Sequence, residues 1–196
     1  ANLIGGRSFT VKLHPGARSS KEARFPGAPD GLKMACGENP KRVYGEKGGP
    51  QTRMGNVAGH RKAFQEGLEY KKAHDRYERK LADWKAGKGK GDSPPDPPSR
   101  DFAKETVAKV IDGEILVHNH CYRADEMLIM MELAEEYGFK IRSFHHAIEA
   151  YKIVDELAAH DVSVSTWADW WGFKAEAYDG VRENGAMLSA AGGRTI

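Results

Sequence analysis

Hydrophobic and polar positions follow two alternating periods in the second half of the chain. Short runs rich in β-branched residues are typical of buried strands, and apolar residues recurring every three or four positions are typical of amphipathic helices. The expected order begins with helix 102–113, strand 114–118, helix 123–138 and strand 140–144. It continues with helix 147–160, strand 162–166, helix 178–193 and a strand beginning at 194. Such units, repeating roughly every 20–30 residues, predict an α/β fold: a partial (β/α)8 barrel of the TIM type.

The first half of the chain has a different composition and residue pattern. Residues 1–56 are rich in glycine and proline and predict short strands at 8–13 and 31–36 within long loops. Residues 57–87 lack proline and carry a narrow apolar stripe, which predicts a charged helix with one packed edge. The prolines and glycines that follow exclude regular structure, so 57–100 is predicted to be a helix-plus-loop insertion within one domain spanning 1–196.

Composition narrows the classes of function. The 196 residues include 30 basic and 28 acidic side chains, for a net charge of +2, which argues against a nucleic-acid partner. No run of 18 apolar residues occurs, so no membrane span is expected. Cys36 and Cys121 are too few for a disulfide framework and are predicted to be reduced and unpaired. Nothing in the sequence assigns a cellular location.

Histidines gather where two of the predicted strands end. His118 ends strand 114–118, and His145 and His146 follow strand 140–144. In a (β/α)8 barrel the carboxyl ends of the strands share one rim, where the chemistry takes place. A period of two also places His118 and His120 on the same side of an extended strand. Because neutral imidazole is a common ligand of zinc and related metals, the pattern favours a metal site. Taken singly, histidines elsewhere are expected to be packed or hydrogen-bonded: His14, His60, His74 and His160.

The segments "ILVHNHCYRADEM" and "FHHAIEAYKIVDELAAH" resemble the metal-dependent amidohydrolase superfamily, specifically its imidazolonepropionase-like and prolidase-like branch. The resemblance implies that His118 is the metal ligand of barrel strand five, with His120 in reserve, and that His146 is the ligand of strand six. His145 stands where many relatives have an acidic residue. Lys33, in "GLKMACG", matches a strand-four lysine that becomes a metal ligand when CO₂ carboxylates it.

The resemblance implies hydrolysis of an amide, cyclic-amide or dipeptide C–N bond by metal-activated water. One or two divalent ions, most simply zinc, would serve as cofactor, and the substrate would be a small molecule. Tyr122, Arg123 and Trp170 lie on strand-end connections and are predicted to contact the substrate.

Two elements of the family pattern are absent. No strand-one histidine pair occurs, and the general-base aspartate is expected beyond residue 196. The sequence is therefore interpreted as the central and C-terminal part of a barrel cut at both ends, expected to be inactive and to fold poorly alone.

Alternatives from other classes stay open. A non-catalytic binding or scaffold protein on a degenerate barrel has the same pattern of strands and helices. A phosphate-binding barrel is less favoured, because "AAGGRTI" follows a helix rather than leading into one. A homo-oligomer is compatible with everything above.

Overall fold

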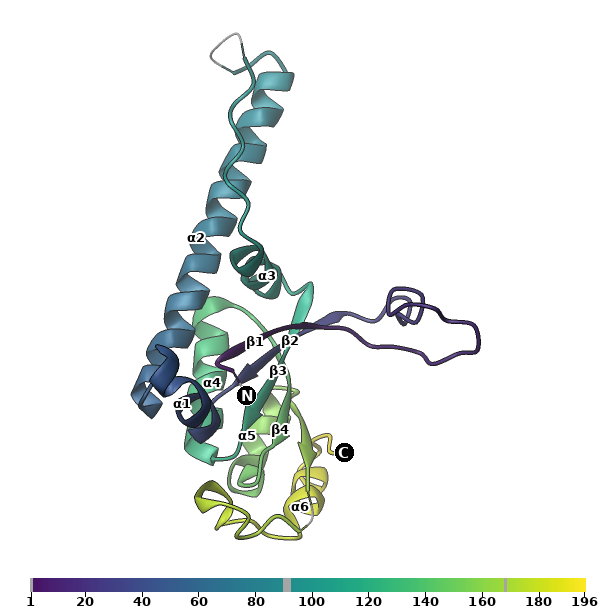
Figure 1. Ribbon diagram of the computed structural model, residues 1–196, viewed down its shortest axis with the longest axis vertical. Helices are drawn as coiled ribbons and strands as arrows, with labels where there is room; N and C mark the ends of the chain where they lie inside the picture. Colours follow the sequence, from purple (N-terminus) through teal and green to yellow (C-terminus); the bar gives the residue numbers. More distant parts are fainter. Residues whose placement is uncertain (1, 90–92, 168) are drawn as a thin grey trace.

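The computed structural model describes residues 2–89, 93–167 and 169–196, and its centre is a five-stranded sheet (Figure 1). The strands lie side by side in chain order: β1 (Ile4–Ser8), β2 (Asp30–Ala35), β3 (Ile115–Cys121), β4 (Ile141–His146) and β5 (Ser163–Thr166). β1 pairs antiparallel with β2, and all other neighbours are parallel. Thr195 adds a parallel bridge to Val164 beyond β5. This mostly parallel sheet with intervening helices is consistent with part of an α/β barrel.

Helical segments connect the strands and cover one face of the sheet. Their bounds are α1 (Glu38–Tyr44), η1 (Gly45–Lys47), α2 (Arg53–Lys85), α3 (Phe102–Ile111), α4 (Ala124–Tyr137), η2 (Ala150–Ile153), α5 (Val154–Ala159), η3 (Ala175–Ala177) and α6 (Asn184–Ala190). Asp101 caps α3 by accepting hydrogen bonds from the amides of Ala103 and Lys104. Gly138 ends α4 in the left-handed conformation that glycine adopts without cost. None of the described helices is both long and apolar enough to cross a membrane.

The hydrophobic core lies between the sheet and these helices. Alternate residues of the strands point into it and are fully buried, as the two-residue period of a strand requires. They meet apolar side chains from α2 to α6. The core includes Leu32, Met34, Val117, Phe144 and Val164 from the sheet and Phe64, Val110, Met127, Leu133, Leu157 and Leu188 from the helices.

The N-terminal strand was misplaced by the sequence pattern. The strand expected at 8–13 runs from Ile4 to Ser8 instead. Within 8–13, Val11 makes only an isolated bridge to Arg24, and its side chain is exposed. Here the chain leaves the sheet as a long excursion that returns at β2 (Figure 1). The alternating apolar residues of 8–13 therefore lie in an exposed loop and do not pack against the core.

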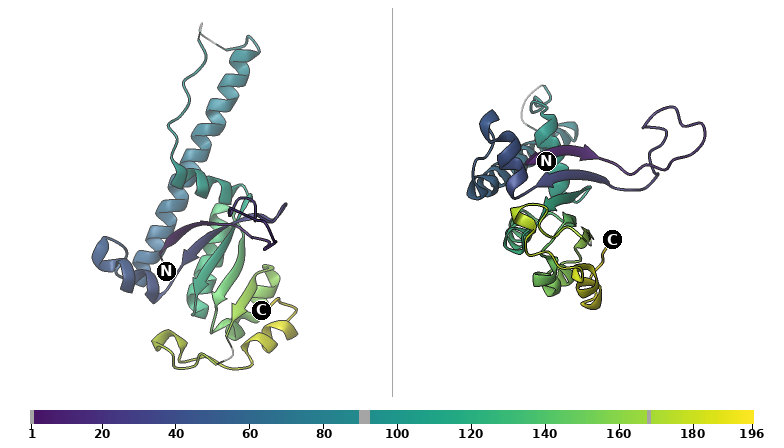
Figure 2. Two further views of the ribbon diagram at one scale, coloured as in Figure 1. Left: turned by 45° about the vertical axis from the view of Figure 1, so that its right-hand side comes forward. Right: turned by 60° about the horizontal axis from the view of Figure 1, so that its bottom comes forward.

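The helices also differ in extent from the pattern. α2 begins at Arg53 rather than Val57, capped by the hydroxyl of Thr52, and projects well beyond the sheet (Figures 1 and 2). The segment 147–160 starts with the short helix η2 because His146 and Ala147 have positive φ angles, 73° and 34°, which no α-helix contains. Helix 178–193 shrinks to Asn184–Ala190.

We predict that Gly67→Ala destabilises the chain although alanine favours helix formation. A Cβ at Gly67 would lie 2.5 Å from Cγ1 of Val107, so α2 and α3 would have to separate. The expected loss is about 1–3 kcal/mol of unfolding free energy, measured by denaturant titration. Lys62→Ala, on the exposed side of the same helix, is the control and should change stability little. Equal or greater stability of Gly67→Ala would contradict the close packing of α2 on α3.

Candidate metal centre at the carboxyl edge of the sheet

Three neighbouring parallel strands bring the predicted ligands to one edge of the sheet. In the register of β2 and β3, Lys33 pairs with His118, and in that of β3 and β4, His120 pairs with His145 and Cys121 with His146. Since paired residues of parallel strands point to the same face, Lys33, His118, His120 and His145 share the face away from the helix-covered core.

The imidazole rings of this edge contact one another. The rings of His118 and His145 have centroids 5.6 Å apart, and those of His120 and His146 are 4.7 Å apart. Nζ of Lys33 lies 2.9 Å from Nδ1 of His145. Gly31 leaves room for His118, because a Cβ there would lie 2.9 Å from the ring. We call His118, His120, His145 and His146 the edge histidines.

Burial keeps the edge histidines uncharged near pH 7. It lowers the pKa of His120 to about 3 and the pKa values of His145 and His146 to about 4, and nearby positive charge adds to the effect. Burial and the charge of Lys33 also lower the pKa of His118. The edge histidines are therefore neutral near pH 7, the form that binds metals. Burial lowers the pKa of Lys33 to about 8, so a substantial share of the amine is neutral in mildly alkaline solution.

Hydrogen-bond donors occupy ring nitrogens of three of the four edge histidines. Nζ of Lys33 lies against His145, the Trp167 indole donates to Nδ1 of His146 at 2.8 Å, and Nδ2 of Asn39 lies 2.8 Å from Nε2 of His120. In the part of the chain that the structure describes, no donor faces a ring nitrogen of His118. His118 is thus the edge histidine whose lone pair is most readily available.

The donor set fits a divalent metal by its chemistry, because it offers neutral imidazoles and an amine that carboxylation would turn into an oxygen ligand. Within the described ranges, however, no three edge-histidine nitrogens lie within 4.8 Å of one another. Binding a metal would therefore require side-chain rotations, including release of His146 from Trp167.

A stack of aromatic rings continues outward from His146. Trp170 lies nearly parallel to His146 with centroids 5.0 Å apart, and to Trp167 and Phe173, each at 4.9 Å. Tyr122 stacks on His146 at 5.4 Å, and burial raises its pKa to about 12, so its hydroxyl stays protonated. The predicted substrate residues Tyr122 and Trp170 are thus both beside a candidate ligand.

Arg123, the third predicted substrate residue, lies at the start of α4 and contacts a residue of that helix rather than a candidate ligand. Its guanidinium forms an ion pair with Asp125, at 2.9 Å, in the first turn of α4. Its side chain is exposed, and the ion pair raises its pKa further. The structure therefore gives Arg123 a partner within its own segment.

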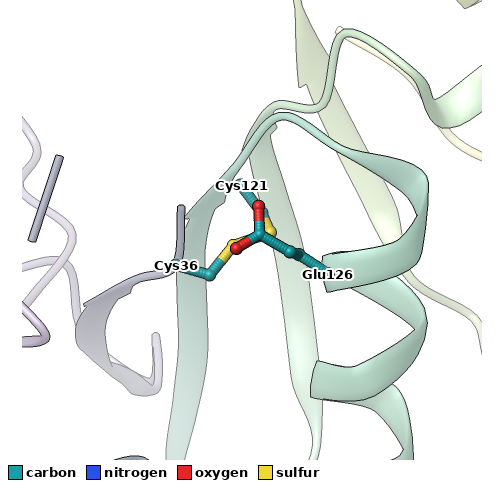
Figure 3. Close-up of side chains that lie close together, drawn as sticks. All are labelled: Cys36, Cys121 and Glu126. Carbon is teal, nitrogen blue, oxygen red and sulfur yellow. A yellow bond between two sulfur atoms is a disulfide. The ribbon is translucent and has the colours of Figure 1, made fainter. Parts of the chain in front are cut away.

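The two cysteines form a disulfide, so the prediction that they are unpaired was wrong. Cys36 follows β2 directly and Cys121 ends β3, and their Cα atoms are 5.2 Å apart (Figure 3). Neighbouring parallel strands create this proximity across 85 residues of sequence, which spacing alone does not reveal. Glu126 lies beside the sulfur atoms and forms an ion pair with Arg53.

Sequence reasoning missed three polar residues of this edge: Asn39, Lys174 and Glu176. Asn39 was detectable in principle, because "GENP" directly follows the strand that carries Lys33. Lys174 and Glu176 come from the loop after β5, more than 130 residues from Asn39, and no sequence signal links them.

Two known proteins are similar to this chain over nearly its whole length. No protein-family model matches the chain. It is 32% identical over 203 residues to a curated protein named amidohydrolase tasK, from Hapsidospora irregularis, covering 96% of this chain and 20% of that protein. A crystal structure of an amidohydrolase from Thermotoga maritima MSB8 matches all of this chain and 47% of its own, with 32% identity and a TM-score of 0.77. The chain thus spans about a fifth of the length of the first relative and about half of the length of the second. The similarities support an amidohydrolase family.

We predict that the metal-free chain loses stability as the pH falls below 6.5. The unfolded state binds protons at histidines of ordinary pKa, near 6.5, whereas folded His120, His145 and His146 bind them only nearer pH 3–4. Their stabilising contribution is complete above pH 6.5 and is lost as the pH falls to about 4. The midpoint of denaturant unfolding, measured from pH 7 to pH 4, should therefore fall as the pH falls.

Replacing His145 by Asn should make this fall of the midpoint with pH less steep, whereas Met54→Ala, at an exposed position, should leave it unchanged. Unchanged slopes in both variants would contradict the account.

We also predict that Cys36→Ala/Cys121→Ala lowers the free energy of unfolding by about 2–5 kcal/mol, because the bridge closes a long loop. A reductant should lower the unfolding midpoint of the original chain and leave that of the double variant unchanged. Two free thiols in the denatured, unreduced protein would show that no bridge exists.

Proposed function

We propose that this chain supplies the central strands of a metal-dependent amidohydrolase that cleaves an amide, cyclic-amide or dipeptide C–N bond. The observation that carries the proposal is the gathering of Lys33 and the edge histidines at one edge of the sheet, on three adjacent parallel strands. His118 contacts His145, His120 contacts His146, and burial keeps the imidazoles neutral. Similarity to two proteins named amidohydrolases supports the same reading.

His118 and His146 would hold a divalent ion, with zinc the best match to imidazole ligands. When bound, the ion lowers the pKa of a coordinated water and polarises the substrate carbonyl. Lys33 would add an oxygen ligand once its amine has reacted with CO₂. Its lowered pKa, about 8, supports this, because only the neutral amine is nucleophilic.

The chain's own side chains would shape the rest of the site. Tyr122, protonated and stacked on His146, can donate a hydrogen bond to a substrate oxygen. Trp170 provides a flat apolar surface beside the same histidine. Together they would orient a small substrate and limit the access of bulk water. The proton acceptor of the reaction is not assigned to a residue of this chain.

Metal analysis tests the proposal. The chain should be equilibrated with zinc and bicarbonate, freed of unbound metal, and analysed by elemental mass spectrometry together with a circular dichroism check of folding. We predict about one zinc or more per chain, and a loss of affinity of at least tenfold in His118→Ala and in His146→Ala. His160→Ala, at an exposed position at the opposite ends of the strands, is the matched control and should bind as the original chain does.

Two outcomes would contradict the proposal. A folded chain that binds no zinc would instead favour a scaffold protein on the same fold. Zinc binding that survives both histidine substitutions would place the metal elsewhere.

A further inference from the structure

A chain of polar contacts runs from the protein interior to His120. Arg53 of α2 binds the carboxylate of Glu176, whose side chain is almost fully buried, at 3.3 Å. Oε1 of Glu176 lies 2.8 Å from Nζ of Lys174, which donates to Oδ1 of Asn39 at 3.0 Å. Nδ2 of Asn39 then lies 2.8 Å from Nε2 of His120.

The direction of every contact in this chain is forced. Arginine and lysine side chains only donate, and an ionised carboxylate only accepts. Because the ammonium of Lys174 must donate, the atom of Asn39 that faces it must be the amide oxygen. The NH₂ group of Asn39 therefore faces His120, and Nε2 of His120 must accept. A neutral imidazole that accepts at Nε2 carries its proton on Nδ1.

Several contacts anchor this chain in place. The amide of Glu38 donates to Glu176 at 3.1 Å, and Gly37 has a φ of 79° and no Cβ, which would otherwise lie 2.4 Å from the Glu176 carboxylate. Lys174 also lies over the ring of Tyr122, 4.0 Å from its centroid. Rotation of Asn39 would break both of its contacts at once.

We propose that Asn39 and Lys174 are positioning residues that fix His120 as an Nδ1–H donor. The donor of His146 is the exposed side chain of Trp167, which can move away, whereas Asn39 is held by Lys174 and Glu176, so it is His120 that is kept from binding a metal. This inference rests on the proposed function, since it assigns the metal to His118 rather than His120. It also gives His120 a role: a hydrogen-bond donor of fixed orientation beside His146, suited to a substrate oxygen.

Nitrogen-15 NMR of the histidine rings in the metal-free chain tests the tautomer, with His120→Asn identifying the signal. We predict Nδ1–H in the original chain. Asn39→Asp reverses the final contact, because a carboxylate held by Lys174 can only accept from His120, so the proton should move to Nε2. Lys174→Met, which frees the Asn39 amide to rotate, should give a mixture of tautomers. Asn2→Asp, at an exposed position, is the matched control and should leave the signal unchanged.

Zinc binding completes the test. His120→Asn should keep the zinc stoichiometry of the original chain, whereas His118→Ala should lose it. An Nε2–H tautomer in the original chain, or equal zinc loss in the two variants, would overturn the inference. If no variant and no original chain binds zinc, the proposed function fails, while the NMR result still decides separately whether Asn39 positions His120.

Discussion

The parallel register of β2, β3 and β4 is the constraint on which the candidate site depends. It pairs Lys33 with His118 and His120 with His145, so that one face of the sheet gathers an amine and imidazoles at its carboxyl edge. Because side chains alternate between faces, a shift of one residue would send His118 into the core and Val117 out of it. The packing of Val117 against the helices therefore fixes the position of His118 as firmly as any contact within the site does.

The same burial that stabilises the fold sets the charge state of the site. The sheet and the loop after β5 exclude enough water to keep the edge histidines neutral and to lower the pKa of Lys33 to about 8. The charged groups lie behind Asn39, where Arg53 and Lys174 neutralise the buried carboxylate of Glu176. The neutral imidazole nitrogens can bind a cation, and the hydrogen bonds from the charged groups around them hold polar side chains in one orientation. Both properties suit a site for a metal ion and a polar substrate.

The sequence predicted those features that local periodicity and strand ends determine. The alternation of strands and helices from 102 onward, the strand that carries Lys33, and the position of His118 beside His145 of β4 all appear in the structure. The Cys36–Cys121 bridge and the contacts of Asn39 depend on residues 81 to 135 positions apart, which only the folded register brings together. The first strand was misplaced because its alternating pattern lies in an exposed arm.

The most direct test of the account is the position of a metal in a crystal of this chain soaked with zinc and bicarbonate. Anomalous scattering at the zinc absorption edge locates the ion independently of the protein density. The account predicts a peak about 2.0–2.1 Å from a ring nitrogen of both His118 and His146, with His120 still bonded to Asn39. A peak bound to His120, or no peak at this edge in a crystal that binds zinc elsewhere, would contradict it.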